Sequence, residues 1–212
     1  MKNRVAQRMT SLSPSLTLAI SAKAKAMKQA GESVVSFSVG EPDFNTPEHI
    51  INAAKAALDA GQTKYTPSSG LLPLRQAICE KFKKDNGLDY EPSQIIVSNG
   101  AKHSIFNACY AVLDEGDEVI IPEPYWLTYP EVVKVCGGVP KYLSCKKENK
   151  YKFSAEDLKA TITPKTKMLI FNSPSNPTGA VYNEEEVRAI AKVCEEAEIF
   201  VLADEIYEKL CY

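Results

Sequence analysis

The sequence predicts an α/β fold with a mostly parallel sheet and helices on both faces. From residue 94 onward, short runs rich in β-branched residues alternate with longer helical stretches, a pattern typical of parallel strands joined by helices. Right-handed connections place those helices on both faces of the sheet. Because no repeat or Gly/Ser-rich linker interrupts the 212 residues, we expect one continuous α/β unit.

The N-terminal part of the chain is predicted to be largely helical. Residues 16–31 are rich in Ala and Lys and end on a glycine, a composition that predicts a helix with a glycine C-cap. The next helix is expected to begin with Thr46 as its N-cap, Pro47 at its first helical position and the acidic Glu48 in its first turn. The expected elements are helices over 16–31, 46–61 and 72–86 and a strand over 34–39.

The C-terminal part supplies the alternating pattern, and its strands are expected to end at the functional site. Ligands of open parallel sheets bind at the carboxyl ends of the strands. Three suggestive clusters, at residues 98–102, 172–179 and 203–207, follow predicted strands. The expected strands are 95–98, 118–122, 139–144, 168–172 and 199–203, and the expected helices are 102–113, 126–135, 155–160 and 184–197.

Composition favours small-molecule chemistry. The net charge is −2 and there is no basic run, so the chain has no electrostatic footprint for nucleic acid or an anionic membrane. The six cysteines lack a Cys-x-x-Cys pair or a nearby histidine, which argues against a zinc site and a disulfide scaffold and favours buried free thiols. With no signal-like N-terminus and no membrane-length apolar run, a cytoplasmic location is expected.

A phosphate-binding turn is predicted between the strand at 95–98 and the helix that follows it. There the amides of Gly100, Ala101 and Lys102 point where a helix N-terminus attracts an anion. Nucleotide fingerprints of the Gly-x-Gly-x-x-Gly or P-loop type are absent from the sequence. A plain strand-to-helix turn remains the alternative at this point.

Trp126 is the only tryptophan of the chain and stands in a proline-stiffened segment just after a predicted strand. A rigid aromatic side chain at that position can stack on a flat ligand. The alternative is that Trp126 covers part of the hydrophobic core, as an isolated tryptophan commonly does.

Two strand ends together suggest the ligand itself. Asp204 follows an apolar run, where an unpaired carboxylate would cost several kcal/mol of desolvation, so it needs a cationic partner. A protonated pyridine nitrogen would serve, and Asn176 and Tyr207 could both hydrogen-bond a phenolic oxygen on the same ring. This combination points to pyridoxal 5'-phosphate; the alternatives for Asp204 are a salt bridge to arginine or a helix N-cap. The Asn176–Pro177 bond is a candidate cis peptide.

With these motifs, the chain resembles the class I aminotransferases, the aspartate aminotransferase family of fold-type I pyridoxal-phosphate enzymes. The resemblance extends through nearly the whole chain. It implies that Gly40, within residues 37–44, meets the substrate carboxylate, and that Tyr65 reaches the cofactor phosphate of the neighbouring subunit. It assigns cofactor contacts to Gly100, Ala101, Lys102, Trp126, Asn176, Asp204 and Tyr207, with Trp126 and Asn176 also beside the substrate.

The resemblance also carries expectations about substrate and organisation. Thr17 and Lys102 match positions that recognise a distal carboxylate in some members, which favours acidic amino acids. Residues 1–45 would form an N-terminal arm and part of a small domain, and 46–212 part of the large cofactor-binding domain of a homodimer. The family's Schiff-base lysine is expected beyond Tyr212, so this chain alone is expected to be inactive. The sheet is likewise expected to be incomplete at its C-terminal side.

The expected function is pyridoxal-phosphate-dependent transamination between an amino acid, aspartate or another acidic one, and a 2-oxo acid. Two alternatives stay open at this stage. Another fold-type I activity, such as that of a β-elimination lyase, would use the same cofactor residues. A non-catalytic fragment that only binds or dimerises is the alternative of a different class.

Overall fold

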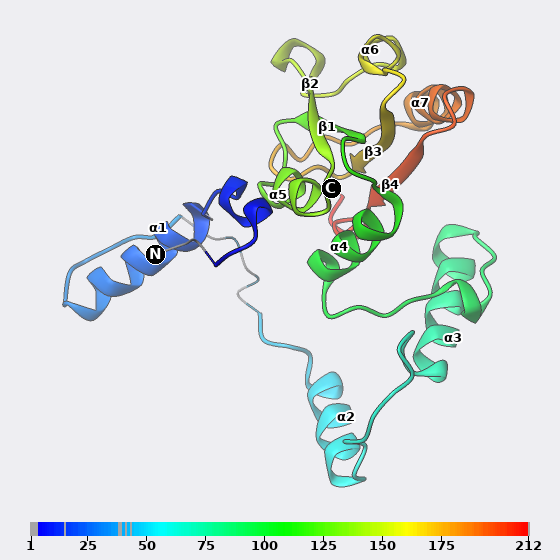
Figure 1. Cartoon of the computed structure of the whole chain (residues 1–212). Coiled ribbons are helices and arrows are strands. Elements are labelled where there is room, and N and C mark those ends of the chain that lie inside the picture. The colour runs from blue at the N-terminus through cyan, green and yellow to red at the C-terminus, as the bar shows by residue number, and fades with distance from the viewer. Residues whose placement is uncertain (1–3, 15, 38–39, 41, 43, 212) are drawn as a thin grey trace. The chain divides into compact units, whose positions relative to one another are not determined.

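The computed structural model describes residues 4–14, 16–37, 40, 42 and 44–211. The chain forms two compact units, one made of Asn99–Tyr212 with the segment up to Ser13, the other of Pro14–Ser98. Figure 1 colours the chain from its N-terminus to its C-terminus and labels the elements of both units. The expected division at residues 45 and 46 concerns the domains of the complete family fold and stays a prediction.

The unit of residues 99–212 contains a four-stranded sheet in the order β2-β1-β3-β4. All three neighbouring pairs are parallel, so the predicted α/β class with a parallel sheet is confirmed. In sequence order the strands are β1 (Glu118–Glu123), β2 (Val139–Ser144), β3 (Thr166–Asn172) and β4 (Phe200–Asp204).

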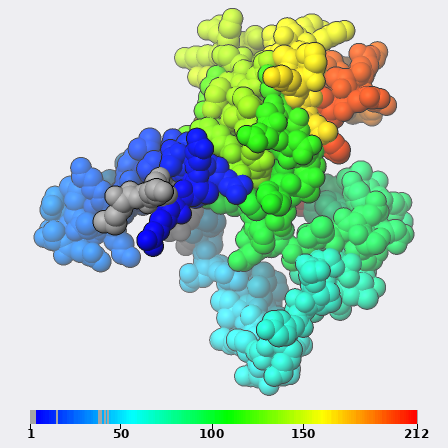
Figure 2. All heavy atoms as spheres, in the orientation of Figure 1, coloured from blue at the N-terminus to red at the C-terminus, as the bar shows by residue number. Residues whose placement is uncertain are grey.

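Alternate residues of the central strands supply two hydrophobic cores, one on each face of the sheet, because successive strand side chains point to opposite faces. Val119 and Ile121 of β1 pack with helices α4 and α5, whereas Ile120, between them, packs with α6 and α7. In Figure 2, α6 and α7 lie side by side as the yellow and orange regions. The helices are α4 (Ala101–Val112), α5 (Thr128–Val135), α6 (Ala155–Thr161) and α7 (Glu184–Glu196).

The unit of residues 14–98 is helical among its described residues. Gly61 and Gly87 adopt positive φ angles of 69° and 68° and follow the ends of the second and third helical segments, as their C-capping role requires. Pro47 is the N-cap residue of its helix rather than the first helical residue. The elements are α1 (Leu16–Gln29), α2 (Glu48–Asp59), α3 (Leu72–Lys81), a π-helical turn η2 (Phe82–Asn86) and a 3-10 turn η3 (Pro92–Gln94).

Two further 3-10 turns complete the unit of residues 99–212. The turn η4 (Lys147–Asn149) lies between β2 and α6. The turn η1 (Gln7–Ser11) packs near α5, where the Ser13 N–H donates to Glu131 Oε2 at 3.0 Å. Both turns are peripheral to the two hydrophobic cores.

Two predicted strands are wrong. At residues 95–98 the Ile95 N–H closes a turn on the Pro92 carbonyl, and the Val97 N–H bonds the Ser69 carbonyl outside any strand. Residues 34–37 of the other predicted strand have no strand structure, and its residues 38 and 39 lie outside the described part of the chain. Both runs are apolar and β-branched, but a strand also needs a neighbour to pair with.

Candidate functional site

The carboxyl ends of β3 and β4 meet at Asn172 and Asp204, which are paired in the strand register. Asn172 Nδ2 donates to the Asp204 backbone carbonyl at 2.8 Å, and Asn172 Oδ1 accepts the Asn176 N–H at 2.7 Å. One amide side chain therefore joins the two strand ends and fixes the start of the following loop. In that loop the Asn176–Pro177 peptide is cis, as the sequence predicted.

Asn176 and Tyr207 lie together beside this junction. Asn176 Nδ2 is 3.5 Å from the Tyr207 hydroxyl, and both side chains are half-buried. The amide keeps a second N–H and the phenol keeps its O–H, so both groups can still donate to a ligand. Such a pair can donate to an oxygen atom of a bound ring.

The Asp204 carboxylate is half-buried and held by neutral donors. The Tyr129 hydroxyl donates to Oδ2 at 2.7 Å, and the Ile206 N–H donates to Oδ1 at 3.2 Å. Among the described residues the contacts of this carboxylate include neither an arginine nor a helix cap, the two alternatives that the sequence left open. Burial, followed by the hydrogen bond to Asp204, raises the pKa of Tyr129 above its usual range, so the hydroxyl remains protonated.

Trp126 lies just before α5 and connects this carboxylate to α4. Its ring meets the Tyr129 ring edge-on, with centroids 5.5 Å apart and planes at 88°. The Lys102 Nζ lies 5.3 Å from the Trp126 ring centroid. Trp126 also packs against the core yet stays half-exposed, so both roles considered for it from the sequence are compatible with its position.

At the N-terminus of α4, the N-cap residue supplies no capping side chain. It is Gly100, with φ 85° and ψ 163°, and the first turn holds no acidic residue. Just before the helix, the Asn99 N–H donates to His103 Nδ1 at 3.2 Å. The first intrahelical donor is His103, so the amides of Ala101 and Lys102 precede the helical ladder. Ala101 and Asp204 line one open hollow of about 330 Å³. The first residue of α4 and the Asp204 carboxylate therefore border the same space.

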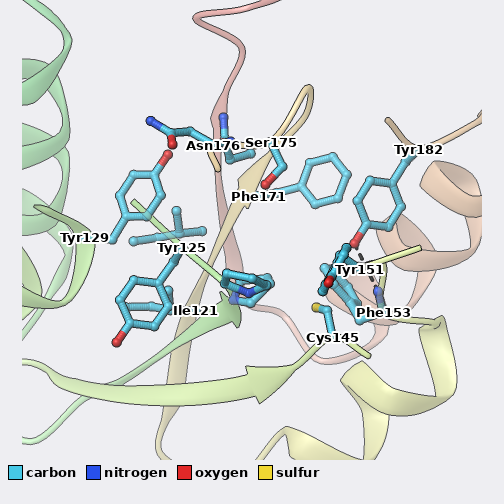
Figure 3. A pocket seen from close by; sticks show the side chains of 14 residues that line it. Ile121, Tyr125, Tyr129, Cys145, Tyr151, Phe153, Phe171, Ser175, Asn176 and Tyr182 are labelled. Carbon is cyan, nitrogen blue, oxygen red and sulfur yellow. Dashed lines mark hydrogen bonds between the residues drawn. The ribbon is translucent and has the colours of Figure 1, made fainter. Parts of the chain in front are cut away.

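A smaller enclosed pocket lies beneath the strand ends (Figure 3). Its volume is about 20 Å³, enough for roughly one water molecule. Aromatic side chains dominate its wall, among them Tyr125, Phe153 and Tyr182, while Asn176 borders it from above. This pocket is too small for a cofactor, whereas the open hollow beside Asp204 is larger and also borders the N-terminus of α4.

The remaining predicted site residues belong to the other unit. Thr17, in the first turn of α1, and Gly40 are exposed, and Tyr65 is fully exposed at 107% of its reference area. Of the predicted substrate segment 37–44, residues 38, 39, 41 and 43 lie outside the described part of the chain. The roles of these residues stay predictions.

The six cysteines are free, as predicted from their spacing, but they are not all buried. Four are buried, at positions 109, 136, 145 and 194, whereas Cys79 is half-buried and Cys211 is exposed. Burial raises the pKa of Cys109 to about 12, so this thiol stays protonated at neutral pH. The described helices include none that is both long and apolar enough to cross a membrane.

The family model for aminotransferase class I and II matches residues 32–212. The chain belongs to this aminotransferase family. It is 55% identical over 209 residues to an aspartate aminotransferase of Bacillus subtilis (strain 168), covering 99% of this chain and 53% of that relative. It is 50% identical over 212 residues to a probable aspartate/prephenate aminotransferase of Aquifex aeolicus, covering 100% of this chain and 54% of that relative.

Solved aminotransferase structures match the fold as well. The aspartate aminotransferase from Thermus thermophilus with maleate superimposes with a TM-score of 0.96 at 44% identity, covering 98% of this chain and 55% of that one. The enzyme from Rhizobium meliloti gives a TM-score of 0.93 at 44% identity, covering 99% of this chain and 52% of that one. The chain thus spans about half the length of the aminotransferases it matches.

Sequence reasoning missed two aminotransferase residues that organise this junction. Tyr129 meets Asp204 from 75 positions earlier in the chain, a contact that no local pattern indicates. Its only signal is its place three residues after Trp126, where the first turn of a helix returns to the same side. Asn172 stood only as the last residue of a predicted strand, and its bond to the Asp204 carbonyl depends on the strand register.

Proposed function

We propose that the complete protein catalyses pyridoxal-phosphate-dependent transamination between an amino acid and a 2-oxo acid. The observation that carries the proposal is the connected set of contacts from Lys102 through Trp126 and Tyr129 to Asp204, beside the Asn176–Tyr207 pair. It lies at the carboxyl ends of β3 and β4, the place where parallel sheets bind ligands. Membership of the aminotransferase family supports the same reaction.

The donors and acceptors of the site fit pyridoxal 5'-phosphate. The amides of Gly100, Ala101 and Lys102 would hold the phosphate at the N-terminus of α4, where the helix dipole favours an anion. Asp204 would pair with the ring nitrogen, because its two oxygens keep acceptor positions beyond their bonds to Tyr129 and Ile206. When bound, the cofactor supplies an electron sink for the bond-breaking step at the substrate's α-carbon.

The other residues would position that ring and limit access of water to it. Asn176 and Tyr207 would donate to the ring oxygen, since their polar groups already lie 3.5 Å apart beside Asp204. Trp126 would cover one face of the ring, with Tyr129 holding the indole edge-on. The contacts of Asn176 with Tyr207 and of Trp126 with Tyr129, together with the family resemblance, support these roles.

An acidic amino acid, with aspartate first, is the proposed substrate. The relatives are named aspartate or aspartate/prephenate aminotransferases, which favours transamination over β-elimination. Gly40 would meet the α-carboxylate, while Thr17 and Lys102 would approach the distal carboxylate. In the whole protein, incubation with aspartate and a 2-oxo acid should yield oxaloacetate and a new amino acid. Release of ammonia from a cysteine-type substrate instead would indicate a lyase.

A homodimer in the cytoplasm completes the proposal. Tyr65 is fully exposed, as expected of a side chain that would reach the phosphate of a neighbouring subunit. The free state of the six cysteines, one of them exposed, suits a reducing compartment. Sedimentation analysis tests the dimer, and a monomer at all concentrations would refute it.

Cofactor binding can be measured directly, because Trp126 is the only tryptophan and reports on the proposed stacking contact. Pyridoxamine 5'-phosphate is the suitable probe, since it cannot bond covalently to surface lysines. We expect it to quench Trp126 fluorescence, and Asp204→Asn to weaken binding at least tenfold, on the order of one charge-assisted hydrogen bond.

The matched control is Asp114→Asn, which makes the same chemical change at an exposed position after α4. It should bind the probe as the unmodified chain does. Equal weakening by both substitutions would indicate a general charge effect and would contradict the role of Asp204.

A further inference from the structure

We propose that Tyr129 is a positioning residue of the cofactor site, holding the Asp204 carboxylate and the Trp126 indole in one fixed arrangement. The inference rests on the proposed function, because Asp204 and Trp126 are the two groups assigned there to the cofactor ring. Neither the sequence motifs nor the family resemblance stated above gives Tyr129 a role.

The first observation is how the carboxylate is held. The Tyr129 hydroxyl donates to Oδ2 of Asp204 at 2.7 Å, while the Ile206 N–H donates to Oδ1 at 3.2 Å. Donors on both oxygens oppose rotation of the carboxylate about its side-chain bond. Since an ionised carboxylate offers about four lone-pair positions, two donors leave room for a ligand donor. The carboxylate is thus oriented before any ligand arrives.

The second observation is that Tyr129 is a dependable donor. Its side chain is only 2% exposed, so water does not compete for the hydroxyl. Burial, together with the neighbouring carboxylate, raises the pKa of Tyr129 above its usual range, so the phenol keeps its proton at physiological pH. A hydrogen bond from a buried neutral donor to a charged acceptor is stronger than an ordinary neutral one.

The third observation is that the same side chain fixes the stacking group. The Tyr129 ring lies edge-on to Trp126, with planes at 88° and centroids 5.5 Å apart, in the arrangement that aromatic quadrupoles favour. The Tyr129 ring is itself packed in the core with Val132 and Val133 of α5. A rigid helix therefore sets the position of the indole and of the carboxylate through one residue.

The test is Tyr129→Phe, which removes the hydroxyl and keeps the ring that packs on Trp126. Without the hydroxyl, Asp204 must be ordered when the ligand binds, a cost of about one immobilised side chain. We expect the affinity for pyridoxamine 5'-phosphate, followed by Trp126 fluorescence, to fall about three- to tenfold. The matched control is Tyr125→Phe, since Tyr125 stacks on Tyr142 rather than bonding Asp204; its affinity should stay within about twofold.

Two readouts separate positioning from a general structural role. Inorganic phosphate, measured by its competition with pyridoxamine 5'-phosphate, should bind Tyr129→Phe as tightly as the unmodified chain, because the α4 turn does not involve the hydroxyl. In an Asp204→Asn background, Tyr129→Phe should change the affinity for pyridoxamine 5'-phosphate by less than about twofold, since the two residues would act through one contact.

The outcomes are distinguishable. Unchanged affinity in Tyr129→Phe, or equal loss of phosphate and pyridoxamine 5'-phosphate binding, would overturn the inference while leaving the proposed function intact. The same holds if Tyr129→Phe weakens binding as strongly without the Asp204 carboxylate as with it. Absence of any pyridoxamine 5'-phosphate binding by the complete protein would instead defeat the proposed function, and this inference with it.

Discussion

Helices α4 and α7 pack on opposite faces of one sheet, and their first turns are built in opposite ways. At α7, the Asn183 side chain accepts the Glu186 N–H at 2.9 Å, and the Glu186 carboxylate accepts the Asn183 N–H at 2.8 Å. At α4, Gly100 offers no side chain, and the only charged residue of the first turn is Lys102. The N-cap residue of α7 therefore caps its helix with a side chain, whereas the N-cap residue of α4 does not.

The difference separates stability from function. Helix α6 repeats the α7 solution with Ser154 and Asp157, so the protein caps helices with its own side chains where only the fold is concerned. An uncapped N-terminus forgoes about 1 kcal/mol of stability. At α4 that cost leaves the amides and the positive end of the helix dipole available for an external anion. The three predictions below test this comparison.

The largest effect is expected from Ala101→Asp, which places a carboxylate where the phosphate is proposed to bind. The new side chain should weaken pyridoxamine 5'-phosphate binding more than tenfold, because two anions would compete for one helix end. The free protein should become about 0.3–1 kcal/mol more stable, since an acid suits an uncapped first turn. Fluorescence titration and urea unfolding measure the two quantities.

These opposite signs make the test of α4 specific. A substitution that simply damaged the structure would lower both stability and affinity. If Ala101→Asp left the affinity unchanged, the N-terminus of α4 would not be the phosphate site.

A smaller effect is expected from Asn183→Ala at α7, which should lower stability and leave affinity unchanged. Removing the cap should lower the free energy of unfolding by about 1 kcal/mol, measured by urea denaturation. Affinity for pyridoxamine 5'-phosphate should not change, because α7 covers the other face of the sheet. A loss of affinity here would show that the two helix ends are not separate in function.

The smallest effect concerns pH and Glu186. The hydrogen bond from Lys152, then that from the Asn183 amide, lowers the pKa of this carboxyl below its usual value. A lowered folded-state pKa stabilises the protein above the unfolded pKa, and that contribution is lost as the pH falls through the folded value. Because the side chain is 35% exposed, solvent screening keeps the contribution small, below about 1 kcal/mol.

Glu186→Gln should therefore be less stable than the unmodified chain near about pH 7, and this difference should shrink toward about pH 3. Urea midpoints of both proteins across that range measure the change. A difference that stayed constant with pH would mean that the charge of Glu186 contributes nothing.

Much of the fold could be read from the sequence, since a strand and helix pattern is a local property. The predicted strands over 118–122, 139–144, 168–172 and 199–203 were each found within two residues at either end. The run at 95–98 failed because β-branched composition cannot show whether a neighbouring strand is present. Ile95 is nevertheless buried, so the apolar pattern predicted the burial of this residue correctly but its pairing in a strand wrongly.

The site was predictable only in part. Asn176, Asp204 and Tyr207 could be grouped because parallel strands bring their carboxyl ends to one edge. The hydroxyl of Tyr129 could not be assigned to Asp204, because that contact depends on how α5 packs on the sheet. The sequence indicated Gly100 as a turn residue. That this N-cap residue makes no side-chain cap bond, in contrast to those of α6 and α7, could be seen only in the structure.

The central claim is that residues of α4, α5, β3 and β4 form one cofactor site, and amide NMR spectra recorded with and without pyridoxamine 5'-phosphate test it most directly. We expect the largest shifts at the Trp126 indole N–H and the backbone amides of Ala101, Lys102, Asn176 and Ile206. Shifts confined to the other large hollow, lined by Lys152, Ser154 and Glu186, would contradict the account, as would no shifts at all.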